Sequence, residues 1–193
     1  MKIQNILPLI AALTLFTATR AVAHDPNGKV DPMNAALEKL KGAEFEQSFL
    51  QQMIQHHRSG IDMAKLVSSN TQRAELRQFA GKTIASQQQE IEKMSGWFKS
   101  WYNASPTEVA NKEVDKEMKM HMSILSEKRD TDFDKAFLDI MPKHHHAAVE
   151  MCGQAEKKAT HPELKEFAAK MAKDQEQEMK QMKQWAKDWF GPA

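Results

Sequence analysis

Two twelve-residue stretches decide the fold: MIQHHRSGIDMA at residues 53–64 and MPKHHHAAVEMC at residues 141–152. Each begins with a methionine, has adjacent histidines three and four positions later, and carries a second methionine near its end. Histidine pairs are unexpected within an amphipathic pattern, because polar groups buried in a core need partners. Their recurrence 88 positions later indicates a duplicated unit.

The duplication extends well beyond these stretches. Residues 45–102 align with residues 133–190 without a gap, and 19 of the 58 pairs are identical. Apolar residues recur at helical spacing in both copies, so each copy predicts a helical hairpin. Between the copies, Ser105-Pro106-Thr107-Glu108 predicts the start of a polar helix that reaches about Leu125. Two hairpins and a connecting helix predict an all-α, antiparallel four-helix bundle.

Signals for helix ends support this division. Thr131 or Asp132 is expected to cap the third long helix, a capping box with an early proline at residues 160–163 to start the fourth, and Gly191 to end it. We expect one domain, residues 24–193, made of an N-terminal segment (24–44), a first hairpin (45–102), a methionine-rich connecting helix (103–131) and a second hairpin (133–190). Four tryptophans at i, i+4 spacing are expected to plug the bundle ends.

The N-terminus predicts export. Lys2, an apolar run over residues 6–16 and Ala21-Val22-Ala23 are typical of a secretory signal of residues 1–23, so the mature chain is expected to begin at His24, in the periplasm or outside the cell. The apolar run is too short to cross a membrane. Removing Lys2 and Arg20 from the 27 basic side chains leaves 25 against 26 acidic ones, which argues against nucleic-acid or membrane partners. Because Cys152 is the only cysteine, no internal disulfide can form.

The histidine pairs are predicted to face the bundle interior. At 100° per residue, Met53, His56, His57 and Gly60 fall within one arc of the first long helix. Gln87 and Glu90 interrupt the apolar stripe of the next helix, at about the same level. Buried polar groups cost roughly 1–3 kcal/mol each when unpaired. The cluster therefore either satisfies itself by hydrogen bonding or binds a ligand, and both interpretations stay open.

If the ligand is a metal ion, the donors indicate copper. None of the eight histidines has a carboxylate three residues before it, as di-iron bundles require. Instead methionine precedes histidine at that spacing three times, in Met53/His56, Met118/His121 and Met141/His144. Thioether donors favour soft, monovalent copper, and silver with it.

The connecting helix adds a second set of soft donors. Its stretch EMKMHM, residues 117–122, places Met118, His121 and Met122 on one face and Met120 elsewhere. This face either packs on the bundle or traps Cu(I). Cys152 is either a small buried residue or a ligand, and His24 is a further candidate, for Cu(II). Pro142 is expected to kink the third long helix and make the two sites unequal.

The candidate metal ligands are therefore methionines, histidines, one cysteine and two glutamates. In chain order they are Met53, His56, His57, Met63, Glu90, Met118, Met120, His121, Met122, Met141, His144, His145, Met151, Cys152 and Glu178.

The pattern of residues 49–64, 76–80 and 87–97 resembles the exported family labelled domain of unknown function 305. The resemblance covers nearly the whole mature chain, in two copies. It implies a ferritin-like four-helix fold, and some members of that family are linked to copper binding and copper tolerance. Carried over by position, it implies metal ligands at Met53, His56, His57 and Met63. The second copy departs from the pattern at residues 142, 143, 149 and 152.

These features lead to one hypothesis and two alternatives. The first is a periplasmic protein that binds Cu(I) to sequester it or pass it on, without catalysis, and that exchanges copper with a copper-exporting or copper-receiving protein. The second is a metal-dependent redox enzyme on a ferritin-like scaffold. The third is a helical interaction module or holdase that uses methionines as an adaptable surface; exposed methionines would favour it and buried ones would not.

Overall fold

The computed structural model describes residues 31–191, which form six helices. These are α1 (Pro32–Glu38), α2 (Gly42–Asn70), α3 (Ala74–Tyr102), α4 (Lys112–Ser126), α5 (Asp130–Lys158) and α6 (Pro162–Phe190). The predicted leader and His24 lie outside the described residues. Between residues 31 and 191 there is no strand, and no helix is long and apolar enough to cross a membrane. The predicted all-α bundle of two hairpins and a connecting helix is confirmed.

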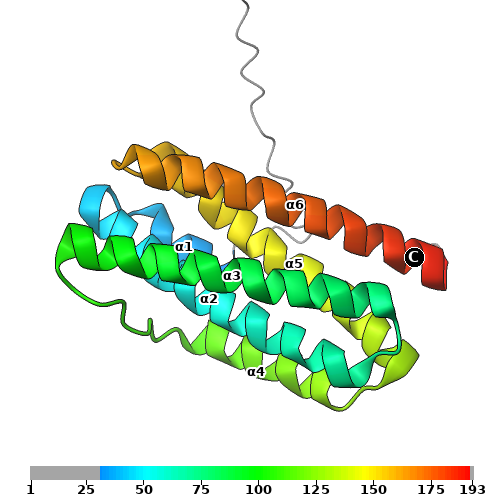
Figure 1. The fold of residues 1–193 in the computed structure, drawn as a ribbon. Coiled ribbons are helices and arrows are strands. Elements are labelled where there is room, and N and C mark those ends of the chain that lie inside the picture. The colour runs from blue at the N-terminus through cyan, green and yellow to red at the C-terminus, as the bar shows by residue number, and fades with distance from the viewer. Residues whose placement is uncertain (1–30, 192–193) are drawn as a thin grey trace, which may run out of the picture.

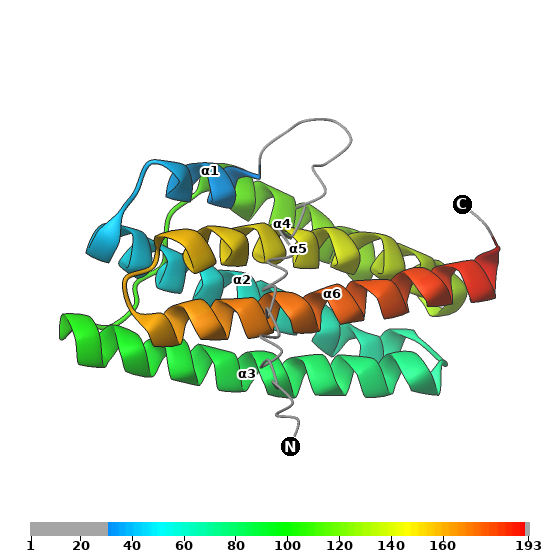
Figure 2. The ribbon, with the colours of Figure 1, turned by 90° about the horizontal axis from the view of Figure 1, so that it is seen from above.

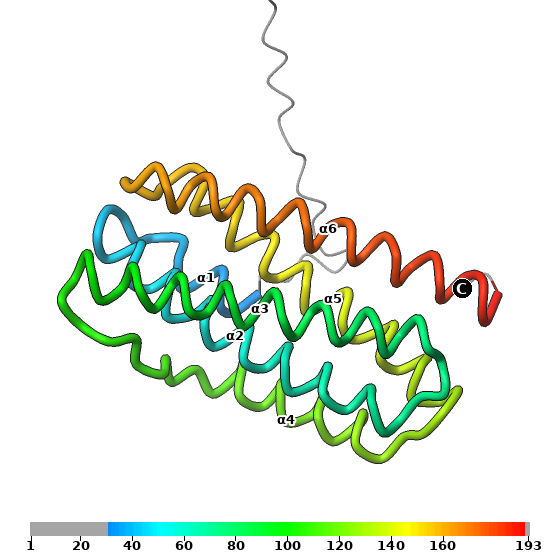
Figure 3. The backbone as a smooth tube through the Cα atoms, viewed as in Figure 1, coloured from blue at the N-terminus to red at the C-terminus, as the bar shows by residue number. Residues whose placement is uncertain are grey.

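The two hairpins, α2–α3 and α5–α6, pack together through α2 and α5 (Figure 1). Helix α4 lies against both α2 and α5, and α1 packs on α5, α2 and α4 (Figure 2). Helices α3 and α6 (Figure 3) make no close backbone contact within the described residues, but their side chains meet, Phe79 with Trp185 and Trp97 with Phe167. These two helices are therefore joined by side chains and not by close backbone packing.

The apolar core is divided in two. A first core cluster lies around Phe45, Phe49 and Met53 of α2 and includes the end of α5 and the start of α6. A second core cluster lies around Phe133, Phe137 and Met141 of α5 and includes the end of α2 and the start of α3. The offset of 88 residues relates these two sets, so the duplicated sequence produces a pseudo-twofold structure in which the copies run antiparallel.

Helix α4 begins later than the sequence predicts. It starts at Lys112, and the side chain of Asn111 caps it by accepting the backbone N–H groups of residues 113 and 114. The predicted start at residues 105–108 is wrong because this segment is tied to α2: Gln51 donates to the hydroxyl of Thr107 at 2.8 Å, and the Val109 N–H donates to Gln55 at 3.1 Å.

The predicted caps of α5 and α6 are also wrong. Helix α5 begins at Asp130, with neither Thr131 nor Asp132 as its cap. The start of α6 has Pro162 in its first turn but no local side-chain cap. Instead the buried carboxylate of Glu46 accepts the backbone N–H groups of Thr160 and His161, at 2.6 and 2.8 Å. A charged acceptor from α2 therefore replaces the capping box. The predicted end at Gly191 is confirmed.

Equivalent polar contacts lie at both ends of the bundle. Glu46 also accepts hydrogen bonds from Tyr102 and the ring of His161, and that ring stacks on Trp101 at 3.9 Å. At the other end Asp134, equivalent to Glu46, pairs with Arg73 at 3.0 Å, and Arg73 lies over Trp189. The tryptophans stack in pairs, 97 with 101 and 185 with 189, beside the first and second core clusters respectively.

Candidate metal site

Four histidines from α2 and α5 form a polar layer between the two core clusters. His57 and His145 are completely buried, and His56 and His144 are only 5% and 6% exposed. The rings of His56 and His144 stack at 3.6 Å between centroids. The ring centroids of His56 and His57 are 6.2 Å apart, as are those of His144 and His145. Because His56 and His144 are equivalent by the offset of 88, the pseudo-twofold axis passes between them.

The inner pair of histidines, His56 and His144, is held by hydrogen bonds that determine the tautomer of each ring. His56 donates from Nε2 to the backbone carbonyl of His144 at 2.9 Å. The Ser59 hydroxyl donates its proton to the carbonyl of His56 at 2.7 Å, so it can only accept from Nε2 of His144, at 2.9 Å. Both rings therefore carry their proton on Nε2, and Nδ1 keeps its lone pair.

The outer pair, His57 and His145, has the same tautomer because each ring donates to a carboxylate. Nε2 of His57 donates to Glu90 at 2.7 Å, and Nε2 of His145 donates to Glu178 at 2.6 Å. Thr83, which is buried, donates to the second oxygen of Glu178 at 3.3 Å. The sequence-based expectation that Glu90 lies level with His57 is confirmed. Metal-binding histidines commonly donate their other nitrogen to a carboxylate in this way.

All four Nδ1 atoms are buried and have no hydrogen-bond partner within residues 31–191. Burial lowers the pKa of His56 to about 3, and the charges of His57 and His145 act in the same direction. Burial likewise lowers the pKa of His144 well below its ordinary value. The inner rings are therefore neutral near pH 7 and present lone pairs where a cation could bind.

Gln87 and Gln175 extend the polar layer toward α3 and α6. They are 2% and 4% exposed, and none of their four amide atoms has a hydrogen-bond partner in the described part of the chain. A buried polar group without a partner costs about 1–3 kcal/mol. Together with Glu90 and Glu178, they line an open cleft of about 610 Å³ between α3 and α6.

The methionines do not group as the family resemblance implies, with Met53 and Met63 of one copy in one site. Met53 and Met63 come from one copy, but Met53 lies in the first core cluster and Met63 in the second. Ten residues of helix separate them by about 15 Å, so one ion cannot contact both. The first cluster instead brings Met53 together with Met151 of the other copy, and the second brings Met141 together with Met63.

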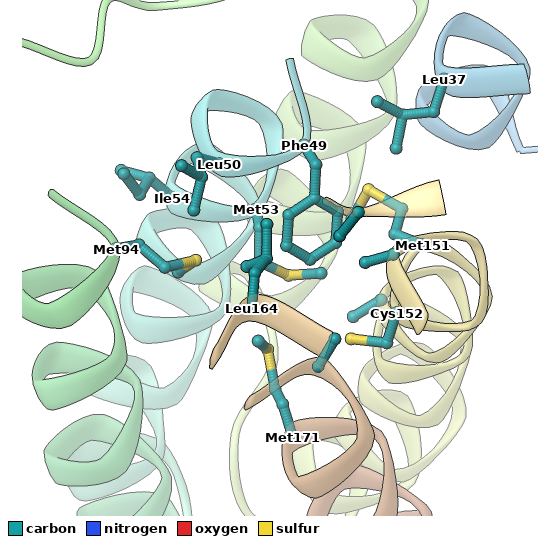
Figure 4. Close-up of a cluster of buried hydrophobic side chains, with 14 of the residues drawn as sticks. Leu37, Phe49, Leu50, Met53, Ile54, Met94, Met151, Cys152, Leu164 and Met171 are labelled. Atoms are coloured by element: carbon teal, nitrogen blue, oxygen red, sulfur yellow. The ribbon is translucent and has the colours of Figure 1, made fainter. Parts of the chain in front are cut away.

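The first core cluster is rich in sulfur. Figure 4 shows Met53 from α2, Cys152 from α5 and Met171 from α6 pointing into one shared interior. Met53 precedes His56 and His57 by three and four residues, so it lies one helical turn from both rings. Met141 has the same relation to His144 and His145. Each of these two methionines is thus one helical turn before a histidine pair.

The connecting helix has the predicted faces. Met118 packs against both core clusters and Met122 against the second, whereas Met120 is 52% exposed. Nδ1 of His121 is buried and unpartnered among the described residues, and burial lowers the pKa of this ring against the raising effect of Glu117. This helix therefore holds soft donors at the surface and at the core boundary.

Two features of the layer are not evident from the sequence. Ser59 sets the tautomer of His144, but its counterpart is alanine, so the duplication gives no signal for it. Between residues 31 and 191, moreover, no group of three or more His, Cys, Asp or Glu side chains is placed to hold a metal ion. A metal site in this layer would therefore need thioether or amide donors as well.

The architecture defines a duplicated four-helix bundle with a histidine layer, and comparison with known proteins assigns the family. The family model described as Domain of unknown function (DUF305) matches residues 17–98 and residues 46–186. The chain belongs to this family. No curated protein matches it.

Solved structures give the same assignment. CopM in its Cu(I)-bound form is 29% identical with a TM-score of 0.66, over 76% of this chain and 98% of that one. CopM in a form soaked with silver gives 29% identity and a TM-score of 0.66, over 76% and 97% of the two chains. A DUF305 fragment from Deinococcus radiodurans is 25% identical with a TM-score of 0.65, over 72% and 92%. CopM also has a Cu(II)-bound and an apo structure.

Proposed function

We propose that this chain is an exported copper-binding protein that sequesters Cu(I) or passes it on. The observation that carries the proposal is the set of four buried Nδ1 lone pairs, all left open by hydrogen bonds to Nε2. Met53 and Met141 lie one helical turn from these rings. Imidazole and thioether together suit Cu(I) and Ag(I), and the solved structures of CopM include forms with Cu(I), Cu(II) and silver bound.

The donor set argues for copper over zinc. Zinc sites use three or four His, Cys, Asp or Glu ligands, and the described residues bring no three such groups together. Sulfur from methionine completes the set only for a soft ion. In this proposal Glu90 and Glu178 hold the outer rings in orientation through Nε2 and are not ligands themselves.

Helix α4 supplies a second set of donors. Met120 is the only large apolar side chain that is exposed among residues 31–191, and Met118, His121 and Met122 lie behind it at the core boundary. A copper-delivering or copper-receiving protein would meet Met120 first. The remaining methionines named as ligands are buried or half-buried, which disfavours the alternative of a methionine-surfaced holdase.

An anaerobic competition titration with a chromophoric Cu(I) chelator tests the proposal. Met53→Leu/Met141→Leu conserves volume and removes both thioethers. Met94→Leu/Met182→Leu is the matched control, because these two methionines are also equivalent by the offset of 88 and completely buried. We expect the first variant to lose roughly tenfold or more in Cu(I) affinity, and the control to bind as the wild type does.

Two results would contradict the proposal. Wild-type protein that fails to compete with the chelator would return the histidines to a purely structural role. Equal losses in the two double variants would show that the affinity depends on general packing. The variant His57→Ala/His145→Ala should weaken binding. His146→Ala is a further control, because His146 is half-buried on the same helix as His145 but lies outside the layer.

A further inference from the structure

Gln87 and Gln175 have surroundings that a structural role does not explain. Both amides are buried without partners among the described residues, at equivalent positions of the two copies. A Cβ on Gly60 would stand 2.7 and 3.3 Å from the two amide atoms of Gln87, and 3.0 Å from Cε1 of His144. The glycine therefore leaves room for this amide beside the ring edge of His144.

His144 also carries an open lone pair. Cε1 is bonded to both ring nitrogens: Nε2 bonds to Ser59, and Nδ1 has no partner within residues 31–191. An amide can turn over to present either its oxygen or its nitrogen. With the oxygen presented, Gln87 and Nδ1 of His144 offer two donors to one cation. Gln175 is the residue equivalent to Gln87 in the other half, where Ala148 replaces Gly60 and its methyl group takes up part of that room.

The amides and the thioethers approach the histidine layer from different sides. Met53 and Met141 lie in the apolar clusters, whereas Gln87 and Gln175 line the open cleft between α3 and α6. Glu90 and Glu178 line the same cleft and their side chains are 16% and 26% exposed, so the layer lies nearest to solvent on this side. Cu(I) prefers sulfur with imidazole, whereas Cu(II) prefers nitrogen and oxygen donors and retains water.

We propose that Gln87 and Gln175 supply oxygen donors from the cleft, and that these amides allow the layer to hold Cu(II) in addition to Cu(I). The inference rests on the proposed copper-binding function and extends it to a second oxidation state. In this arrangement the imidazoles serve both ions. The choice between sulfur and amide oxygen depends on the ion.

The test compares two ions in one variant. Gln87→Leu/Gln175→Leu removes both amides, and Gln89→Leu/Gln177→Leu is the matched control, since these exposed glutamines line the same cleft on the same helices. Cu(II) binding is measured by competition and by its electron paramagnetic resonance spectrum, and Ag(I) serves as the redox-inert substitute for Cu(I). Urea unfolding of the metal-free proteins reports on folding.

We expect Gln87→Leu/Gln175→Leu to lose roughly tenfold or more in Cu(II) affinity and to change the Cu(II) spectrum, with Ag(I) affinity within about threefold of wild type. The metal-free variant should be at least as stable as the wild type, because two unpartnered amides are gone. Unchanged Cu(II) binding would overturn the inference, as would equal losses for Cu(II) and Ag(I). Wild-type protein that binds Ag(I) but not Cu(II) would refute this inference alone, whereas one that binds neither would refute the proposed function too.

Discussion

The substitution Gly60→Ala measures how tightly the histidine layer is packed. The new methyl group would lie 2.7 Å from Oε1 of Gln87 and 3.0 Å from Cε1 of His144. Gln87 ends in a flexible amide that can move. The ring of His144 cannot move as easily, because it stacks on His56 at 3.6 Å and donates to Ser59 at 2.9 Å.

The expected magnitude is the difference between two opposing effects. Alanine is favoured over glycine in a helix interior by about 1 kcal/mol. Forcing a methyl group into a filled site costs about 1–3 kcal/mol. Gly60→Ala should therefore destabilise the protein by roughly 0–2 kcal/mol. Gly81→Ala and Gly96→Ala, in α3, place the methyl group where no heavy atom lies within 4 Å. They should stabilise the protein by about 0.5–1 kcal/mol each.

Urea unfolding followed by circular dichroism gives the comparison, with all variants free of metal. Cu(I) competition on the same samples shows whether Gly60→Ala also weakens binding, which is expected because the methyl group displaces Gln87 or His144. If Gly60→Ala gained as much stability as the two α3 controls and kept full affinity, the close approach of Gln87 and His144 would be refuted, and with it the geometry of the amide proposal.

Three further predictions concern the rest of the fold. Burial raises the pKa of Glu46, but its hydrogen bonds outweigh this effect and lower the pKa from 4.5 to about 2, so the carboxylate adds stability above pH 4.5 that is lost as the pH falls toward 2. This contribution is on the order of 3 kcal/mol, and urea midpoints against pH should show it in the wild type and not in Glu46→Gln. Arg73→Ala leaves the buried Asp134 without its partner and should cost about 2 kcal/mol, whereas Lys65→Ala, from an exposed ion pair, should cost less than about 1 kcal/mol in the same assay. Dilute peroxide should convert Met120 to its sulfoxide before any core methionine with little loss of stability, as peptide mass mapping of residues 31–191 would show, and early oxidation of a core methionine would contradict the burial of that side chain.

The sequence predicts the hairpins well because two independent signals agree. Helical periodicity identifies each long helix, and the offset of 88 residues pairs them without a gap. The level of Glu90 opposite His57 also follows from counting residues outward from a turn, and the 2.7 Å hydrogen bond confirms it. Both inferences need only local geometry and the direction of the chain.

Helical periodicity and counting along the chain do not predict properties that depend on packing between the two copies. The family resemblance names Met53 and Met63 together but does not show that the antiparallel α2 and α5 bring Met53 to Met151 instead. Helix starts fail for a related reason. Glu46 reaches the start of α6 from a distant turn, and a local capping pattern carries no information about such an acceptor.

Under the proposed copper-binding function, the two halves of the layer should bind metal unequally, although a pseudo-twofold axis relates them. The histidines and glutamines of the layer that are equivalent by the offset are identical, as with His57 and His145 or Gln87 and Gln175. Several positions packed around these donors differ, however. The pairs are Ile54/Pro142, Ser59/Ala147, Gly60/Ala148 and Ala64/Cys152.

The pair Ala64/Cys152 adds a thiol to one half only, and the other three differences act on the surroundings of a donor. Helix α5 continues through Pro142 but has no N–H there to bond the preceding turn. Ser59 holds the tautomer of His144, whereas His56 depends on a backbone carbonyl for the same purpose. Since His56 and His144 stack directly on each other, an ion that moves one ring must also move the other. Under the proposed copper-binding function, the first ion bound would therefore change the site for the second, and the two sites would not be independent.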